Sequence, residues 1–93
     1  MRGETQVPPL KPIRLSGHAR KQLQFLGATE QEVIEAIRTE QWGPAELGRL
    51  DCRKNYSFNA EWNGHYYGMR QVRPIFVDEQ EEIVVVTVYV YYF

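Results

Sequence analysis

The stretch Lys54–Tyr67, which reads KNYSFNAEWNGHYY, decides the fold of this chain. From Tyr56 to Trp62, apolar and polar side chains alternate, a pattern typical of a strand with one buried face. Asn63-Gly64 follows directly and favours a two-residue hairpin turn, because both residues tolerate a positive φ. The stretch therefore predicts an antiparallel hairpin. The expected partners across it are Trp62 and His65, Ala60 and Tyr67, Phe58 and Met69, and Tyr56 and Gln71.

Two further strands are expected after the turn, over His65–Val77 and Ile83–Phe93. Pro74 has no backbone N–H to donate to a neighbouring strand, so we expect an edge position or a β-bulge there. The last strand is apolar almost throughout, which is typical of a strand buried on both faces. Simple alternation puts Val84, Val86, Val88 and Val90 on one of its faces, and Ile83, Val85, Tyr89 and Tyr91 on the other.

The expected register also decides where the basic side chains of the hairpin lie. Arg70 is expected opposite Ser57, and Lys54 opposite Arg73. Two like charges directly across a strand pair are unfavourable unless an anion or a carboxylate lies between them. The pair of Lys54 and Arg73 therefore indicates either an anion site or a register slip at Pro74, because one bulge reverses every facing beyond it.

Before the hairpin, the sequence predicts two short helices. Ser16 is a suitable N-cap for the first, and Gly27 can end it because glycine readily adopts a left-handed conformation. Thr29 and Glu32 form a capping box, in which each side chain accepts a hydrogen bond from the other's backbone N–H. This second helix is expected to reach about Gln41. An αα-hairpin packed on an antiparallel β-meander of three to four strands is an α+β fold.

The 93 residues are enough for one domain, which we expect to occupy residues 15–93. Residues 1–14 contain several prolines and are expected to form a flexible arm. They hold no apolar run of the kind found in signal peptides, and Ile83–Phe93 is too short for a membrane helix. The single Cys52 cannot form an internal disulfide and is expected to be buried. These features predict a cytoplasmic protein without membrane association.

Charge is segregated along the chain although it nearly cancels. The 11 Lys and Arg residues and 12 Asp and Glu residues give a net charge of -1. Residues 1–21 and 49–73 are mainly basic, whereas residues 30–48 and 78–82 are mainly acidic. The two histidines lie far apart with no cluster of Cys or carboxylate residues to support them, so neither a metal site nor another cofactor is expected. The balance of charge also argues against strong nonspecific binding to nucleic acid.

Three segments of the chain resemble one protein family. They are Ser16-Gly17-His18-Ala19, Leu26–Val33 and Val85-Val86-Thr87-Val88-Tyr89. In these segments and in their order, residues 15–90 resemble domain-of-unknown-function family 4258, a family of small bacterial proteins. Where that family tends to place Arg four residues after the His, this chain has Gln22. The resemblance implies the fold of the RelE/ParE toxins, with two helices packed on an antiparallel sheet, and an antitoxin-like protein or RNA as the partner.

RNA cleavage of the RelE type would require a group that moves protons and cations that hold the phosphate. The candidates for this chemistry are His18, Arg70, Arg73 and Tyr89. His18 lies in the first turn of a predicted helix, where the helix N-terminus favours the neutral imidazole. A purely structural role is the alternative for His18. The candidates for binding nucleic acid or a protein partner are Arg53, Lys54, Arg70, Arg73, Tyr89 and Tyr91.

One face of the sheet is expected to stay uncovered, because the two helices of a two-layer domain cover only the other. An uncovered apolar face usually marks association, so we expect a protein partner or RNA to bind there. The alternatives are a toxin-type mRNA endoribonuclease of a toxin–antitoxin pair and a non-catalytic module that forms homodimers. Seven aromatic residues could share one sheet face, either as core or as a binding surface. They are Tyr56, Phe58, Trp62, Tyr67, Tyr89, Tyr91 and Phe93.

Overall fold

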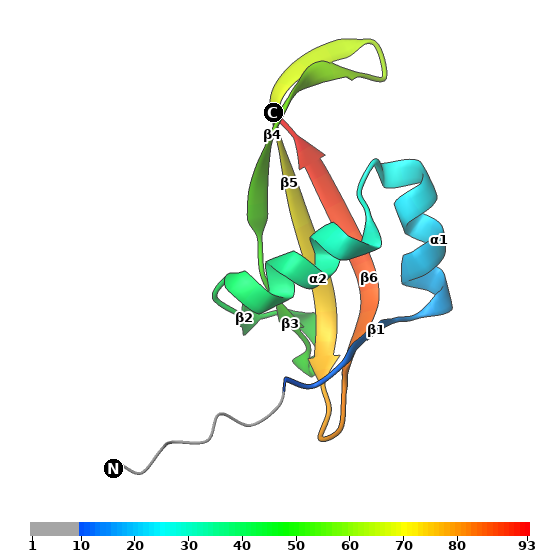
Figure 1. Ribbon diagram of the computed structural model, residues 1–93, viewed down its shortest axis with the longest axis vertical. Coiled ribbons are helices and arrows are strands. Elements are labelled where there is room, and N and C mark those ends of the chain that lie inside the picture. The colour runs from blue at the N-terminus through cyan, green and yellow to red at the C-terminus, as the bar shows by residue number, and fades with distance from the viewer. Residues whose placement is uncertain (1–9) are drawn as a thin grey trace.

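The computed structural model describes residues 10–93, which form two helices and a six-stranded mixed sheet. In chain order the elements are β1 (Ile13–Leu15), α1 (Gly17–Leu26), α2 (Glu30–Thr39), β2 (Gly43–Pro44), the short 3-10 helix η1 (Glu46–Gly48), β3 (Leu50–Asp51), β4 (Lys54–Trp62), β5 (His65–Asp78) and β6 (Ile83–Tyr92). The strand order is β1-β6-β5-β3-β2, and β4 also pairs with β5. Both helices lie on one side of the sheet, α2 across β5 and α1 beside β6 (Figure 1). The α+β class is confirmed, but the two helices do not form the expected αα-hairpin, because α1 packs on β6 and α2 packs on β5 at a steep angle to α1.

Both ends of α1 and the start of α2 are formed by the residues that the sequence predicts. Ser16 Oγ accepts a hydrogen bond of 3.1 Å from the backbone N–H of Ala19, and Gly27 ends α1 with a φ of 75°. Thr29 and Glu32 form both hydrogen bonds of the capping box at the start of α2. The second helix ends at Thr39, slightly earlier than expected. These caps fix where α1 begins and ends and where α2 begins, through contacts within a few residues.

The first strand of the sheet corrects the expected boundary of the N-terminal arm. Ile13 and Arg14 belong to β1, which pairs in parallel with the start of β6, Ile13 opposite Ile83. The backbone N–H of Ser16 continues this pairing with a 2.9 Å hydrogen bond to the Val85 carbonyl. The sheet is therefore mixed and not a purely antiparallel meander. Residues 1–9 of the predicted arm lie outside the described part of the chain.

The hairpin of β4 and β5 has the predicted turn but a different register beyond it. Trp62 pairs with His65 and Ala60 with Tyr67, as expected. The register then shifts by one between Ala60 and Ser57, where Asn59 has a φ of 49°. The expected pairs of Phe58 with Met69 and Tyr56 with Gln71 are therefore wrong. The observed partners are Ser57 and Met69, Tyr56 and Arg70, and Lys54 and Val72.

This shift removes the two expected pairings of the basic side chains. Lys54 lies opposite Val72 and not opposite Arg73, so these two like charges do not face each other across the ladder. Arg70 lies opposite Tyr56 and not opposite Ser57. Lys54 and Arg73 therefore do not form the anion site that the expected register indicated. The slip occurs at Asn59, well before Pro74.

A second irregularity lies next to Pro74, where the sequence predicts a bulge or an edge. Ile75 pairs with Thr87 and Phe76 with Val85, so Val86 is an extra residue in β6. An extra residue reverses the facing of the strand beyond it. Simple alternation along β6 is therefore a wrong prediction. Ile83, Val85 and Val88 are all buried in the core, packed together with residues of both helices, and Tyr89 and Tyr91 lie on the opposite face.

The core lies between the helices and the sheet. Its fully buried members include Ala19 and Ala36 from the helices and Val72, Phe76 and Val85 from the sheet. Cys52 is 2% exposed, as expected, and burial raises the pKa of its thiol to about 12. A thiol with such a pKa stays protonated and unreactive near neutrality. Neither helix within residues 10–93 is long and apolar enough to cross a membrane.

Beyond β1, the outer edge of β6 is covered by a side chain of α1. The Gln22 side-chain oxygen accepts a 2.9 Å hydrogen bond from the Val88 backbone N–H and a 2.8 Å bond from the Thr87 hydroxyl. Unpaired backbone groups at a sheet edge favour association with further strands. Gln22, which departs from the pattern of the family that the sequence resembles, thus has a structural role at this edge.

Candidate binding site on the open sheet face

The candidate site lies on the sheet face that is turned away from α1 and α2. We call this the open face, and define it by Gln71, Arg73, Ile75, Tyr89 and Tyr91. Gln71 is paired with Tyr91, and Arg73 with Tyr89. The two tyrosines are 45% and 41% exposed, and their rings are stacked with centroids 6.4 Å apart. The bulge in β6 thus places two of the predicted binding residues on the surface and not in the core.

Arg73 is held in one orientation on this face. Its Nε donates a 2.8 Å hydrogen bond to Asp51 Oδ2, and its Nη1 donates a 3.3 Å bond to the Tyr91 hydroxyl. The guanidinium also lies 5.6 Å from the centre of the Tyr89 ring, within the range of a cation–π contact. The hydrogen bond to Asp51 raises the pKa of Arg73. Arg73, Tyr89 and Tyr91, three predicted site residues, thus form one cluster on the open face.

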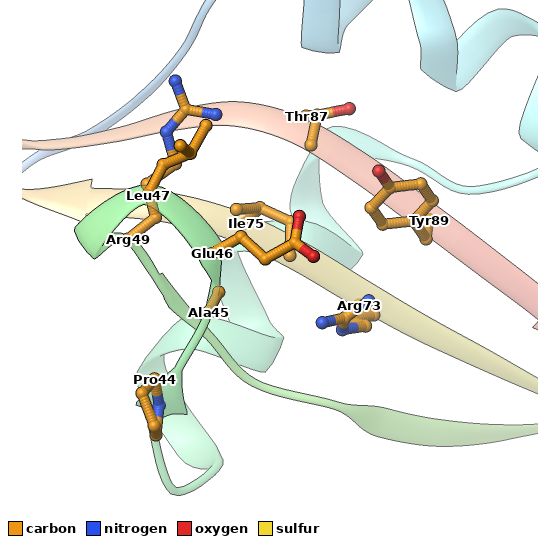
Figure 2. A pocket seen from close by; sticks show the side chains of 9 residues that line it. All are labelled: Pro44, Ala45, Glu46, Leu47, Arg49, Arg73, Ile75, Thr87 and Tyr89. Atoms are coloured by element: carbon orange, nitrogen blue, oxygen red, sulfur yellow. The ribbon is translucent and has the colours of Figure 1, made fainter.

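A hollow of about 520 Å³ lies beside this cluster, between the sheet and the loop of residues 44–49. Figure 2 shows Leu47 and Arg49 on one side of the hollow and Tyr89 and Arg73 on the other, with the Glu46 side chain extending between them. The hollow therefore has a carboxylate, two guanidinium groups and a phenol on its walls. Its lining residues are Pro44, Ala45, Glu46, Leu47, Arg49, Arg73, Ile75, Thr87 and Tyr89.

Three residues beside the predicted ones were not expected at this site: Glu46, Arg49 and Asp51. They lie in the segment between α2 and β4, which has neither helical nor strand periodicity. Asp51 belongs to the two-residue strand β3, which reaches β5 through the pairing of Asp51 with Ile75. Two signals were available in the sequence, since Gly43-Pro44 and Gly48 punctuate this segment and mark turns. Such signals do not say which side of the sheet the turns cover.

The backbone at Leu47 is unusual for its residue type. Leu47 has a φ of 61° and a ψ of 32°, and Gly48 follows with a φ of 72°. A leucine in this left-handed region costs about 1–2 kcal/mol. Its side chain is 84% exposed, so burial within this chain does not offset that cost. Leu47 therefore projects from the rim of the hollow as a strained and exposed apolar residue.

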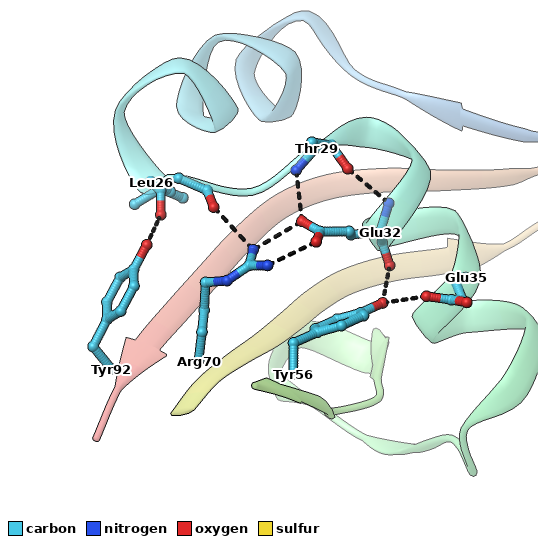
Figure 3. Close-up of polar contacts among 8 residues, drawn as sticks. Leu26, Thr29, Glu32, Glu35, Tyr56, Arg70 and Tyr92 are labelled. Atoms are coloured by element: carbon cyan, nitrogen blue, oxygen red, sulfur yellow. Dashed lines mark hydrogen bonds and ion pairs between the residues drawn. The ribbon is translucent and has the colours of Figure 1, made fainter. Parts of the chain in front are cut away.

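Arg70, predicted as a catalytic and binding residue, lies on the other face of the sheet. It is 9% exposed, and its guanidinium makes hydrogen bonds of 2.8 and 2.7 Å to the two carboxylate oxygens of Glu32. A third bond of 2.9 Å joins it to the Gly27 carbonyl, as Figure 3 shows together with the neighbouring contacts of Tyr56 and Tyr92. The Arg70 hydrogen bond lowers the pKa of Glu32, against the effect of burial. In this structure Arg70 joins the helices to the sheet and has no access to the open face.

The remaining candidates are separated from the hollow as well. Lys54 pairs with Glu40 at 3.2 Å on the helix side of the sheet. Arg53 is exposed in the short connection between β3 and β4. His18 is exposed in the first turn of α1 and does not line the hollow. Of the four predicted catalytic residues, the fold thus brings together only Arg73 and Tyr89.

Nothing in the described part of the chain resembles a metal centre. Within residues 10–93, no group of three or more His, Cys, Asp or Glu side chains is arranged to hold a metal ion. The polar groups around the hollow are guanidinium, phenol, hydroxyl and carboxylate groups, which suit hydrogen bonding to organic partners.

No protein-family model matches the chain, and no curated protein or solved structure matches it either. The resemblance to domain-of-unknown-function family 4258 therefore stays a prediction, as does the RelE/ParE-like character of the fold.

Proposed function

We propose that this protein binds a protein partner through the open face of its sheet. The observation that supports this most is the pair of exposed, stacked tyrosines beside the oriented guanidinium of Arg73. Tyr and Arg are enriched in protein–protein interfaces, because they offer a large contact area together with hydrogen-bonding groups. Arg73 is held by Asp51 before any partner arrives, so little side-chain entropy is lost on binding.

The charge of this face favours a protein over a nucleic acid. Arg49 and Arg73 are balanced by Glu46 and Asp51 around the same hollow and its adjoining cluster. Binding to a nucleic-acid backbone depends on an excess of cations that neutralise phosphates, and this face has none. The family resemblance implies an antitoxin-like protein as one such partner, and a second copy of the chain is the alternative.

A site-specific photo-crosslinker in place of Tyr91 tests this proposal in the native cells. We expect an adduct of defined mass on irradiation, and none when the same crosslinker replaces Phe25, which is 75% exposed on α1. The protein found in the adduct is then purified, and its affinity is measured by calorimetry. Tyr89→Glu should weaken binding about tenfold or more, because it places a charge in the interface core, while Phe25→Glu should leave it unchanged. Absence of any adduct at Tyr91 would contradict the proposal.

RNA cleavage is a second candidate function, favoured by one specific observation. Glu46, Arg73 and Tyr89 line the same hollow, and they provide a carboxylate base, a cation for phosphate and a phenolic acid. Transfer of a phosphoryl group from the leaving oxygen to a 2′-hydroxyl needs a base, an acid and stabilisation of the developing negative charge. This candidate corresponds to the toxin-type endoribonuclease that the sequence resemblance implies.

Incubation of the purified protein with ribosome-bound and free mRNA tests this second candidate. We expect cleavage products that Glu46→Gln reduces by about a hundredfold, the lower range for loss of a general base. Glu46 is exposed, so its replacement should leave the fold intact, which circular dichroism checks. Unchanged RNA, together with normal growth of cells that express the protein, would exclude this function.

A further inference from the structure

We propose that the partner at the open face is a second copy of this chain, docked so that each copy inserts Leu47 into the hollow of the other. The inference rests on the proposed function, since it uses the same face, and it adds the identity of the partner. It follows from two properties of the loop of residues 44–49. The loop carries a projecting side chain, Leu47, beside a hollow that can receive one, and it carries two residues of opposite charge, Glu46 and Arg49.

The projection is the Leu47 side chain. It is 84% exposed on a backbone with a φ of 61°, so the loop holds an apolar side chain in solvent at a conformational cost. Asn or Gly would occupy this left-handed position with less strain, but neither would offer an apolar side chain. A contact that buries Leu47 accounts for both its conformation and its residue type.

The hollow lies directly beside this projection. Pro44, Ala45 and Ile75 contribute apolar surface to it, and Tyr89 adds a half-exposed ring on the far side (Figure 2). Its volume of about 520 Å³ is ample for a leucine side chain together with its neighbours. Because projection and hollow share one face, a two-fold axis that brings Leu47 of one copy to the hollow of the other brings the second Leu47 to the first hollow in the same way.

Glu46 and Arg49 lie close to Leu47 in the loop and carry opposite charges, so the loops of two copies related by the same two-fold axis are complementary in charge. Glu46 and Arg49 form no ion pair with any other residue in 10–93, although six pairs are present there and Arg73 is paired with Asp51. In a two-fold contact, if one residue of the first copy contacts a different residue of the second copy, the same two residues also make contact with the copies exchanged. Glu46 can therefore face the partner's Arg49 while Arg49 faces the partner's Glu46. A face with a single sign of charge would repel its own copy, and this face carries both signs.

Sedimentation velocity at micromolar and submillimolar concentrations tests the proposal. We expect the unaltered chain to form a dimer as concentration rises. Glu46→Arg and Arg49→Glu should each weaken the dimer about tenfold or more, because each brings like charges together twice. A mixture of the two variants should associate again, since the two arginines of one chain then meet the two glutamates of the other. The double variant E46R/R49E should also dimerise.

The apolar part of the contact has its own variant and control. Leu47→Asn introduces a residue that tolerates the left-handed backbone and removes the apolar side chain. It should weaken the dimer about tenfold or more. Leu10→Asn changes another exposed leucine, 72% exposed and outside the loop, and should leave association unchanged. Circular dichroism verifies that each variant is folded.

Four results would overturn the inference. One is a monomer at submillimolar concentration, and another is a dimer that resists both the charge reversals and Leu47→Asn, which would place the interface elsewhere. The third and fourth come from the crosslinker at Tyr91. An adduct with a different protein and none at twice the mass of the chain would refute self-association but support the proposed function. The absence of all adducts would refute both.

Discussion

Arg70 and Glu32 form a two-bond ion pair that joins the central strand β5 to the first turn of α2, with N–O distances of 2.8 and 2.7 Å. Glu32 also accepts a 3.0 Å hydrogen bond from the Thr29 backbone N–H, so one carboxylate both caps α2 and anchors it to the sheet (Figure 3). Arg70 is nearly buried, whereas the Glu32 side chain is 23% exposed. The pair therefore couples local helix capping to tertiary packing.

Glu32→Gln tests the contribution of this ion pair to stability. Glutamine can still accept the Thr29 N–H, so the capping box is retained while Arg70 loses its counter-charge. We expect the free energy of unfolding to fall by about 3 kcal/mol, the lower end of the range for breaking a buried pair, because Glu32 is partly exposed. Chemical denaturation measures it. Glu82→Gln, which breaks the exposed pair with Arg14, is the control and should have no measurable effect.

The same pair predicts a dependence of stability on acid pH. The Arg70 hydrogen bond lowers the pKa of Glu32 below its ordinary value of 4.5, so the folded state binds a proton here less readily than the unfolded state. The stabilisation is fully present above about pH 4.5 and is lost as pH falls through the folded-state pKa. The unfolding free energies of the unaltered chain and of Glu32→Gln should converge in acid. Curves that stay parallel down to the acid transition would contradict this assignment.

The strained backbone at Leu47 predicts an unusual stabilising substitution. Leu47→Gly removes the cost of a left-handed leucine, and the gain exceeds the entropic cost of glycine in the unfolded chain by about 0.5 kcal/mol. Little burial is lost, because the side chain is 84% exposed. Thermal unfolding at low micromolar concentration, where association is weak, measures the effect. Leu47→Ala keeps the strain and should show no gain, and a clear loss of stability in Leu47→Gly would show that Leu47 packs within its own chain.

At Gly27, in contrast, replacement by alanine is expected to destabilise the fold. It has a φ of 75°, and an added Cβ would collide with the Tyr92 hydroxyl and the Trp62 ring. Gly27→Ala should therefore lower the free energy of unfolding by about 2 kcal/mol or more. Gly17→Ala is the matched control, since no other group lies within 4 Å of its added Cβ. Denaturant titration of the two variants compares them directly, and equal stability would contradict the close packing at Gly27.

Much of the fold was predictable because its signals are local. The Ser16 N-cap, the Gly27 terminus and the capping box of Thr29 and Glu32 each depend on residues within one helical turn. The alternation from Tyr56 to Trp62 and the Asn63-Gly64 turn likewise specify a hairpin by themselves. These features depend on backbone conformations and short-range hydrogen bonds that the rest of the chain does not need to supply.

The candidate site was only partly predictable. Arg73, Tyr89 and Tyr91 were predicted as binding residues, and the fold brings them into contact. Glu46 and Arg49 were missed, because their segment has no periodicity and reaches the site only through the pairing of β3 with β5. The parallel pairing of β1 with β6 was missed for the same reason, since parallel strands distant in sequence share no turn signal.

Local sequence specifies the two helices, the three long strands and the Asn63-Gly64 turn, whereas the short strands β1, β2 and β3 and the face that each strand turns to the helices depend on the tertiary structure. Arg70 and Arg73 are three residues apart, so strand alternation already separates them onto opposite faces, but only the packed structure shows that Arg70 is nearly buried against Glu32 and that Arg73 lies on the open face. Tyr89 and Tyr91 reach that face because Val86 is an extra residue opposite β5. The side-chain period of a strand is two, so a single bulged residue exchanges core and surface for everything beyond it. The position of the bulge depends on how the helices pack against the sheet, and no short stretch of sequence specifies it.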